Sequence, residues 1–405
     1  MYAKKTLKVA SFFSGCGGMD LGFEGGFWVN SKSIIDRDWI DAVNADTVRL
    51  KRTDFETVFA CDIKKSAKLA WEGYFSRPGT FYYASIVDLV KKAECGEFVF
   101  PEADVVTGGF PCQDFSIAGK RNGFKSHRTH NNQVDPDIPS IESRGMLYYW
   151  LRKAVAIIKP KIFIAENVKG LISLGEVKDI IINDFRTING GYLVLEPKVL
   201  QAADYGVPQS RERIFFICIA KEYMTDTAIK KIKEGMINLY PEKSHDAKKQ
   251  FVSVRDAVFD LCEPENSHDL SHQNYSKAKW YGKHCQGQTE VYPDGLAPTI
   301  RSEHHGNIEF RRLSEANGGR INSEYHLPQR RLSVRECARI QTFPDDFQLV
   351  TDKVSTSDAY KLVGNAVPPL LAYHVARQIQ KNWSELFDSV AHAQQTYHKT
   401  MNKVA

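Results

Sequence analysis

The sequence predicts an α/β protein with a doubly wound, mostly parallel sheet and a smaller, loop-rich region inserted late in the chain. Short apolar runs alternate with helical stretches through the first half, which is typical of parallel sheets covered by helices on both faces. From residue 221 to residue 330 the chain turns irregular and polar, and a regular helical pattern resumes at residue 331. We therefore divide the chain into a large α/β domain (1–220), a small loop-rich domain (221–330) and a C-terminal segment (331–405).

Five apolar runs rich in Val, Ile and Phe are the predicted strands, at residues 7–13, 57–61, 103–106, 162–165 and 214–219. Runs of this length and composition suit strands that are buried on both faces. Helical stretches at 66–74, 145–158 and 175–186 lie between several of them. Ligands of such sheets bind beyond the carboxyl ends of the strands, so the residues directly after each run are the candidates for function.

Composition sets the broad class. With 405 residues, 42% of them hydrophobic, the chain is long enough for one large domain and a second smaller one. The net charge of +5 permits a polyanionic partner without requiring one. No apolar run is long enough to cross a bilayer, and the N-terminus is predicted to be a strand and not a signal peptide. The eight cysteines lie singly, which disfavours a zinc ribbon or a disulfide framework, so we expect a cytoplasmic protein without a metal ion.

A glycine-rich turn follows the first predicted strand and opens a helix. Its residues are Phe13, Ser14, Gly15, Gly17 and Gly18. Glycines let backbone N–H groups approach a ligand closely. The spacing is not the G-x-G-x-x-G of dinucleotide sites, which favours a nucleoside without a pyrophosphate over NAD. A plain tight turn is the alternative.

Three further candidates also follow apolar runs. Asp62 ends the second run, where an acid commonly accepts hydrogen bonds from ribose hydroxyls; the alternative is a helix cap. Cys112 follows a proline in a glycine-preceded turn after the third run, which presents its thiol instead of burying it. Glu166 ends a fully apolar run, so poor solvation should raise its pKa; a capping acid is the alternative.

Two arginines lie at the start of the last predicted strand. Arg211 and Arg213 occupy alternate positions, so their side chains are expected to point the same way. That arrangement suits holding an anion or a base carbonyl, and a pair of surface charges is the alternative.

Taken in order, these segments resemble the DNA cytosine-5 methyltransferases, especially the single-chain bacterial modification enzymes. The segments that carry the resemblance are Phe13–Gly18, Gly109-Phe110-Pro111-Cys112-Gln113, Glu166-Asn167-Val168, Gln209-x-Arg211-x-Arg213, residues 331–347 and Gly364-Asn365-x-Val367. The match spans nearly the whole chain except 221–330. It implies a Rossmann-like, S-adenosylmethionine-dependent methyltransferase domain, a small target-recognition domain at 221–330, and a C-terminal segment that returns to the catalytic domain.

The resemblance also assigns roles. It implies contacts with S-adenosylmethionine from Phe13, Ser14, Gly15, Gly17, Gly18, Asp62, Ile63, Ser85, Ile86, Pro111 and Asn365. One position departs from the family pattern, because an Asp-Ile pair that usually meets the adenine amine is here Ser85-Ile86, with Asp88 nearby. Either Ser85 or Asp88 can serve.

The implied reaction adds the Cys112 thiolate to carbon 6 of a cytosine, so that carbon 5 becomes electron-rich and takes the methyl group. Glu166 would act at N3, and Arg213, together with Arg211, would hold the O2 side of the ring. The base that removes the carbon-5 proton is not identified. Inside a duplex the target must be flipped out of the stack.

Double-stranded DNA is the expected partner, with a restriction endonuclease as a functional counterpart, and the enzyme is expected to be a monomer in the bacterial cytoplasm. Because arginine is the residue most often bidentate to guanine, Arg301, Arg311 and Arg312 are the leading candidates for DNA contacts, together with residues 280–284. The alternatives are an RNA (tRNA) cytosine-5 methyltransferase and an inactive DNA-binding relative. The size of the insert at 221–330 favours DNA, and an intact set of Cys112, Glu166 and both arginines favours an enzyme.

Overall fold

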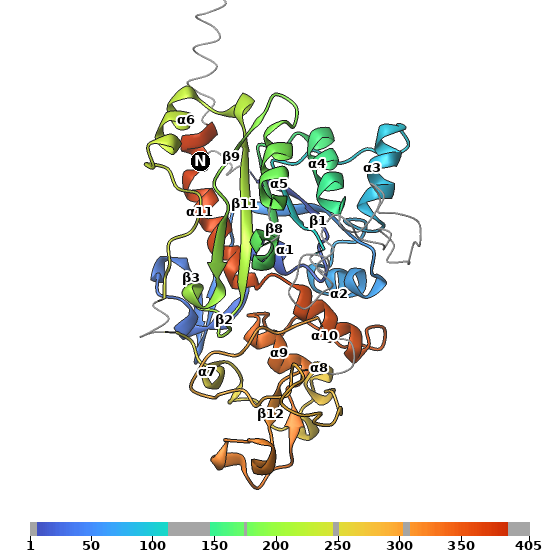
Figure 1. The fold of residues 1–405 in the computed structure, drawn as a ribbon, viewed down its shortest axis with the longest axis vertical. Helices are drawn as coiled ribbons and strands as arrows, with labels where there is room; N and C mark the ends of the chain where they lie inside the picture. Colours follow the sequence, from blue (N-terminus) through green and yellow to red (C-terminus); the bar gives the residue numbers. More distant parts are fainter. Residues whose placement is uncertain (1–5, 112–145, 174–175, 246–250, 303–307, 388–405) are drawn as a thin grey trace, which may run out of the picture.

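The computed structural model describes residues 6–111, 146–173, 176–245, 251–302 and 308–387. Within them, the centre of the molecule is an eight-stranded sheet of order β10-β11-β8-β7-β1-β5-β6, with β9 also paired to β11 (Figure 1). Its strands are β1 (Leu7–Phe12), β5 (Phe55–Asp62), β6 (Phe81–Tyr83), β7 (Val105–Gly109), β8 (Ile162–Val168), β9 (Tyr192–Val194), β10 (Lys198–Gln201) and β11 (Glu212–Ala220).

Five of these strands run parallel, from β6 through β5, β1 and β7 to β8, and β11 is antiparallel to its neighbours. The chain winds outward from β1 in both directions, which confirms the predicted doubly wound sheet. The third predicted strand is displaced toward the C-terminus: β7 spans Val105–Gly109, and the Asp104 side chain just before it accepts a hydrogen bond from the Lys8 amide of β1 at 3.0 Å.

Alternate residues of the central strands enter two separate cores. Val9 and Ile164 pack in one cluster, whereas their neighbours Ala10 and Phe163 pack in the other. The first core contains residues of α1 (Gly18–Glu24), α2 (Lys65–Phe75), α9 (Val334–Ile340), α10 (Thr356–Asn365) and α11 (Pro369–Phe387). The second contains residues of α3 (Ile86–Glu94), α4 (Leu147–Ile158) and α5 (Val177–Arg186).

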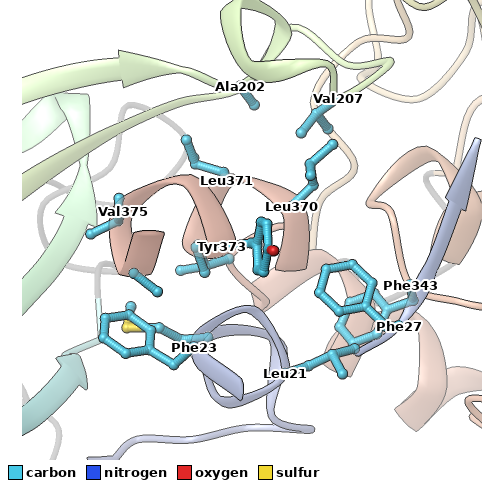
Figure 2. Packing of buried hydrophobic residues seen from close by; sticks show 14 of the residues in the cluster. Leu21, Phe23, Phe27, Ala202, Val207, Phe343, Leu370, Leu371, Tyr373 and Val375 are labelled. Carbon is cyan, nitrogen blue, oxygen red and sulfur yellow. The ribbon is translucent and has the colours of Figure 1, made fainter. Parts of the chain in front are cut away.

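The last described helix packs against the first. Figure 2 shows Leu370, Leu371, Tyr373 and Val375 of α11 above Leu21 and Phe23 of α1. Close approach requires glycine at Gly22, since a Cβ there would lie 2.4 Å from the Pro369 carbonyl oxygen. The end of the chain thus builds one side of the domain that its beginning starts.

A second, three-stranded sheet lies between α1 and β5. It has the order β2-β4-β3, with β2 at Trp28–Asn30, β3 at Ile40–Asn44 and β4 at Thr47–Leu50. The side chains of Asn30 and Lys32 bond to Asp256 of α7 (Val254–Val258), at 2.8 and 2.7 Å. This insert therefore contacts the region that follows the large sheet.

Regular structure between residues 221 and 330 is sparse in the described part. It consists of α6 (Asp226–Lys233), α7, α8 (Leu270–Gln273) and the pair β12 (Phe310–Arg312) and β13 (Arg330–Arg331), besides short 3₁₀ turns. The sequence predicted no sustained helix here, but Thr225 caps α6 by accepting from the Ala228 amide. The Tyr240 hydroxyl donates to the Phe215 carbonyl of β11 at 2.9 Å, so residues up to about 240 lie against the large sheet. No described helix is long and apolar enough to cross a membrane.

Candidate active site

A cavity of about 210 Å³ opens at the carboxyl ends of β1, β5, β7 and β8. The order in which strands are added to the sheet reverses between β1 and β7: β5 and β6 lie on one side of β1, and β7 and β8 on the other. Ligands of doubly wound sheets bind at such a switch point. Most of the predicted site residues line this cavity: Phe13, Ser14, Gly15, Gly18, Asp62, Ile63, Ser85, Ile86, Pro111, Glu166, Arg213 and Asn365. Gly17, Arg211, Arg301, Arg311 and Arg312 are not among its lining residues, and Cys112 lies outside the described residues.

The glycine turn after β1 forms one end of the cavity. Phe13 and Gly15 both have a φ of 55°, a left-handed conformation that is uncommon for a phenylalanine. A Cβ at Gly15 would meet no atom within 4 Å, so space for a ligand lies beside it. Gly17 has a packing reason instead, because a Cβ there would lie 2.7 Å from the Trp71 ring.

Asp62 fixes this turn. Its carboxylate accepts from the Gly15 amide at 3.1 Å and from the Lys64 amide at 2.9 Å. Burial raises the pKa of Asp62, while Lys64 and the backbone N–H groups offset part of that shift. The side chain therefore supports the turn and still presents its carboxylate at the cavity.

The next strand end distinguishes Ser85 from Asp88. Ser85 is buried, caps α3 by accepting from the Val87 amide at 3.2 Å, and lines the cavity with Ile86. Asp88 is exposed and is not a lining residue. The geometry favours Ser85 for a contact with a bound ligand.

Glu166 and Arg213 form the opposite end of the cavity. Both are largely buried, and Arg213 Nε lies 3.1 Å from Glu166 Oε1. Burial raises the pKa of Glu166, and Arg213 and Arg211 offset this shift only in part. The raised pKa expected from the sequence is thus found. Gly109 makes room for the carboxylate, since a Cβ there would lie 3.0 Å from Glu166 Oε2.

Asn167 fixes the chain just before Cys112. Its side-chain Nδ2 donates to the Phe110 carbonyl at 3.1 Å, and its side-chain Oδ1 accepts from the Val168 amide at 2.8 Å. Phe110 precedes Pro111, which lines the cavity. The segment that leads to Cys112 is therefore held against the strand that bears Glu166.

The two arginines of the β11 edge do not share a direction, contrary to the expectation from their alternation. Arg213 reaches Glu166 and the cavity. Arg211 is fully buried and donates to the carbonyls of Ile300, Gly364 and Ala366 at 2.7–2.9 Å. The difference arises because Arg211 precedes the strand, which begins at Glu212, so the alternation of strand side chains does not extend to it.

Comparison with known proteins identifies the family. Residues 7–381 match the family model described as C-5 cytosine-specific DNA methylase. The chain belongs to this family.

The curated relatives agree. The Type II methyltransferase M.BsuRI of Bacillus subtilis is 32% identical over 395 residues, covering 93% of this chain and 80% of its own. The Type II methyltransferase M.MthTI of Methanothermobacter thermautotrophicus is 31% identical, covering 93% of this chain and 98% of its own. Among solved structures, the Schizosaccharomyces pombe Dnmt2 methyltransferase has a TM-score of 0.55 at 17% identity, over 93% of this chain and 99% of its own, which supports the fold.

The protein is thus a DNA (cytosine-5-)-methyltransferase, and S-adenosylmethionine is its methyl donor. The cavity of this DNA methylase fits that donor. The open space beside Gly15, the Asp62 carboxylate, Ser85 and Ile86 all belong to the lining of this one cavity. The donor supplies an electrophilic methyl group when bound.

The arginines predicted to contact DNA are placed differently from one another. Arg311 and Arg312 are buried and paired with carboxylates, Arg311 Nη2 with Glu324 at 2.7 Å and Arg312 Nη1 with Glu263 at 2.9 Å. In this arrangement neither guanidinium is available to DNA, because each is already enclosed with its counter-ion. Arg301 is half-buried and remains a candidate.

Three polar residues of this methylase, to which no role was assigned from the sequence, are buried at or near the site. Thr107 lines the cavity, and within the described residues its buried hydroxyl has no hydrogen-bond partner. Gln209 and Gln341 are fully buried and bond to each other at 2.9 Å. The available signals were a hydroxyl just before Gly108-Gly109 and the glutamine that opens the Gln209-x-Arg211-x-Arg213 motif.

Proposed function

We propose that this enzyme methylates a cytosine that has been flipped out of a specific double-stranded DNA sequence, with Cys112 as the attacking thiolate. The observation that carries this proposal is the cavity itself. It has the glycine turn and Asp62 at one end, and at the other Glu166, Arg213 and Pro111, the residue before Cys112. A donor of a methyl group and an acceptor base can meet in such a space.

Carbon 5 of cytosine is too poor a nucleophile to attack the methyl donor unaided. A bond from the Cys112 sulfur to carbon 6 breaks the ring's double bond and makes carbon 5 the nucleophile of an enamine. The methyl group moves to carbon 5, and the sulfonium departs as a neutral thioether. The carbon-5 proton then leaves, and the electron pair of its bond re-forms the double bond as sulfur is expelled.

Glu166 supports the addition step. When sulfur adds to carbon 6, electron density collects at N3, where a proton from a carboxyl group neutralises it. Burial raises the pKa of Glu166, which favours the protonated form that this step needs. General acid catalysis of this kind contributes about 10²–10⁴-fold. Arg213, 3.1 Å from Glu166, orients the carboxyl group and lies within reach of the same base.

We further propose that DNA lies against the loop of residues 277–284. No acidic residue occurs between 270 and 289, whereas Lys277, Lys279 and Lys283 are all exposed, and Tyr281 is 56% exposed. Lysines without competing acids are the usual contacts to phosphates. Arg331 gives the loop its shape by donating to the carbonyls of Ala278, Lys279 and Gly287 at 2.7–2.8 Å.

The loop also leads toward the cavity. The Ser276 amide donates to the Tyr360 hydroxyl of α10 at 3.1 Å. Tyr360 precedes Asn365, a lining residue, by five positions, which is roughly 8 Å along a helix. A duplex that touches the loop can thus deliver a flipped base to the cavity.

The biological setting follows from the relatives, which are Type II methyltransferases. We propose that the enzyme acts as a monomer in the bacterial cytoplasm and protects DNA from a cognate restriction endonuclease. Its recognition region is proposed to begin near residue 241, later than the boundary at 221, because residues before it pack on the large sheet.

A trapping experiment tests the mechanism. When the target cytosine carries fluorine at carbon 5, sulfur can add and the methyl group can transfer, but fluorine cannot leave as a cation, so the adduct persists. Wild-type enzyme with S-adenosylmethionine should give a denaturant-resistant complex with fluorinated duplex DNA and none with tRNA that carries 5-fluorocytosine. Cys112→Ala should give none, whereas the matched control Cys95→Ala, an exposed cysteine, should trap normally. Peptide mapping should place the adduct within residues 108–120, and attachment to another cysteine would overturn the assignment.

A further inference from the structure

Three buried polar side chains lie where the recognition region meets the wall of the cavity. Gln209, Arg211 and Gln341 are each 0% exposed. We call them the 209–211–341 hub. Fully buried polar groups are expensive unless their hydrogen bonds are made, so the partners of these three residues indicate what they hold.

Arg211 joins two segments that are distant in sequence. Nη1 donates to the Ile300 carbonyl at 2.8 Å, while Nη2 donates to Gly364 and Ala366 at 2.9 and 2.7 Å. Ile300 belongs to the region predicted to read DNA. Gly364 and Ala366 line the cavity. One guanidinium therefore spans from the recognition region to the cavity wall.

The two glutamines repeat this connection. Gln209 Oε1 accepts from the Ile300 amide at 2.8 Å, and its Nε2 donates to Gln341 at 2.9 Å. Gln341 Nε2 in turn donates to the Val363 carbonyl at 2.6 Å, just before Gly364. Both backbone groups of Ile300 are thus held by the hub, the amide by Gln209 and the carbonyl by Arg211.

Further contacts hold the segment 297–301 against Ser210 on one side and against the end of α10 on the other. The Thr299 hydroxyl donates to the Ser210 carbonyl at 2.5 Å, and the Ser210 amide donates to Ala297 at 2.8 Å. A Cβ on Gly364 would lie 2.1 Å from the Arg301 carbonyl carbon, so the end of α10 touches the backbone of Arg301 directly. The position of the segment 297–301 and that of the cavity wall 364–366 are consequently set together.

We propose that Arg211 is a positioning residue that sets the cavity wall according to the placement of the recognition segment 297–301. This inference rests on the proposed function. When the segment is seated on its DNA sequence, Ile300 holds the guanidinium, and the guanidinium holds Gly364 and Ala366 in the geometry that methyl transfer requires. A planar fork can serve both sides at once, whereas the single ammonium of a lysine cannot. Small errors in such placement cost rate steeply.

A pair of matched substitutions separates this role from simple stability. Arg211→Lys keeps the positive charge that acts on Glu166 and removes only the fork. Arg335→Lys is the control, because Arg335 is similarly buried and its fork likewise joins distant segments: it donates to the Pro344 and Phe347 carbonyls, both at 3.0 Å, and to Asp269 at 2.6 Å. It touches neither the cavity nor the segment 297–301. Arg213→Lys serves as the comparison for a loss of rate at the reacting base.

The experiment uses the full-length enzyme and the sequence found by mapping 5-methylcytosine in DNA of cells that express it. Methyl transfer and equilibrium binding are each measured on duplexes with the mapped sequence and with one base pair changed, together with melting temperature. One changed base pair typically costs a DNA-binding protein about 5- to 160-fold in affinity. In Arg211→Lys, kcat on the mapped sequence should fall about 100-fold, and the transfer ratio between the two duplexes should fall at least 10-fold.

Arg335→Lys should lower the melting temperature similarly and keep the wild-type ratio. Arg213→Lys should lower kcat and also keep the ratio. The proposed role of Arg211 would be overturned if Arg211→Lys kept the wild-type transfer ratio between the two duplexes, or if Arg335→Lys lost that ratio to the same extent. Absence of methyl transfer by the wild-type enzyme would instead overturn the proposed function, and with it this role of Arg211, whereas a wild-type ratio in an active Arg211→Lys enzyme would overturn the role of Arg211 alone.

Discussion

Two clusters of buried charge in this enzyme shift the pKa of a glutamate in opposite directions. In the cavity, Glu166 has Arg213 beside it, and burial still raises the pKa of its carboxyl group. In α9, which directly follows the recognition region, Glu336 is also fully buried, but its bidentate pair with Arg330, at 2.8 and 3.0 Å, lowers its pKa despite burial. The same residue type is therefore kept ready to carry a proton in one place and firmly ionised in the other.

The difference lies in how many partners each carboxylate has. The recognition cluster consists of Arg311, Arg312 and Arg330 with Glu263, Glu324 and Glu336. Each glutamate in it contacts two arginines, so ion pairs and hydrogen bonds offset the cost of removing its charge from water. Glu166 keeps one oxygen next to Gly109 at the edge of the cavity. A carboxylate left partly unsatisfied is available to a substrate, and a saturated one supports a fold.

The largest expected effect comes from neutralising the cavity carboxylate. Glu166→Gln should lower kcat by about 10²–10⁴-fold, because the amide keeps a hydrogen bond but cannot give up a proton. The melting temperature should stay the same or rise, since removing a poorly solvated carboxyl group relieves a cost of folding. Steady-state methylation and thermal unfolding check both parts. A variant that lost stability in proportion to its activity would place Glu166 with the structural glutamates.

A smaller effect on function and a larger one on stability should follow a change in the recognition cluster. Burial alone would raise the pKa of Glu263, but hydrogen bonds from Arg312 and Arg330 outweigh it and lower the pKa to about 2. Glu263→Gln should reduce the free energy of unfolding at pH 7 by about 3 kcal/mol, because Arg312 and Arg330 each lose one of their two buried counter-ions and keep only Glu324 and Glu336.

The stability difference between wild type and Glu263→Gln should depend on pH. A carboxylate with a depressed folded pKa stabilises the fold above its ordinary pKa, and this stabilisation is lost as the pH falls toward the folded value. The difference between wild type and Glu263→Gln should thus be full at neutral pH and shrink between about pH 4.5 and pH 2. Urea unfolding across this range measures it, and a difference that did not change with pH would exclude ionisation of Glu263 as its cause.

The smallest effect should come from exposed cations of the same region. Lys283→Ala should weaken DNA binding only a few-fold and lower the slope of log affinity against log salt by about 0.9, the value for one phosphate contact. The matched control Lys233→Ala, an exposed lysine of α6, should leave the slope unchanged. Titrations at several salt concentrations provide the slope. If both variants behaved alike, the loop 277–284 would not be where DNA lies.

Much of this molecule could be predicted from local pattern. Apolar runs of strand length placed β1, β5, β8 and β11 to within a few residues, because a strand buried on both faces needs apolar side chains at consecutive positions. Glycines and a carboxylate after those runs predicted the turn at Gly15 and the dry position of Glu166. The order of motifs predicted the family, since each motif is a short segment whose chemistry is carried by adjacent residues.

Only the tertiary structure decided which arginines are free to act. Arg311 and Arg312 were predicted to meet DNA, yet their partners Glu263 and Glu324 lie 12 to 49 residues away and enclose them. Arg211 and Arg213 are two residues apart in the motif, but Arg211 donates to the carbonyls of residues 300, 364 and 366, whereas Arg213 pairs with Glu166. A sequence records which residues are present and how they alternate locally. The partners of a buried charge come from segments brought together by folding, and they determine whether that charge reads DNA, carries a proton or holds the fold.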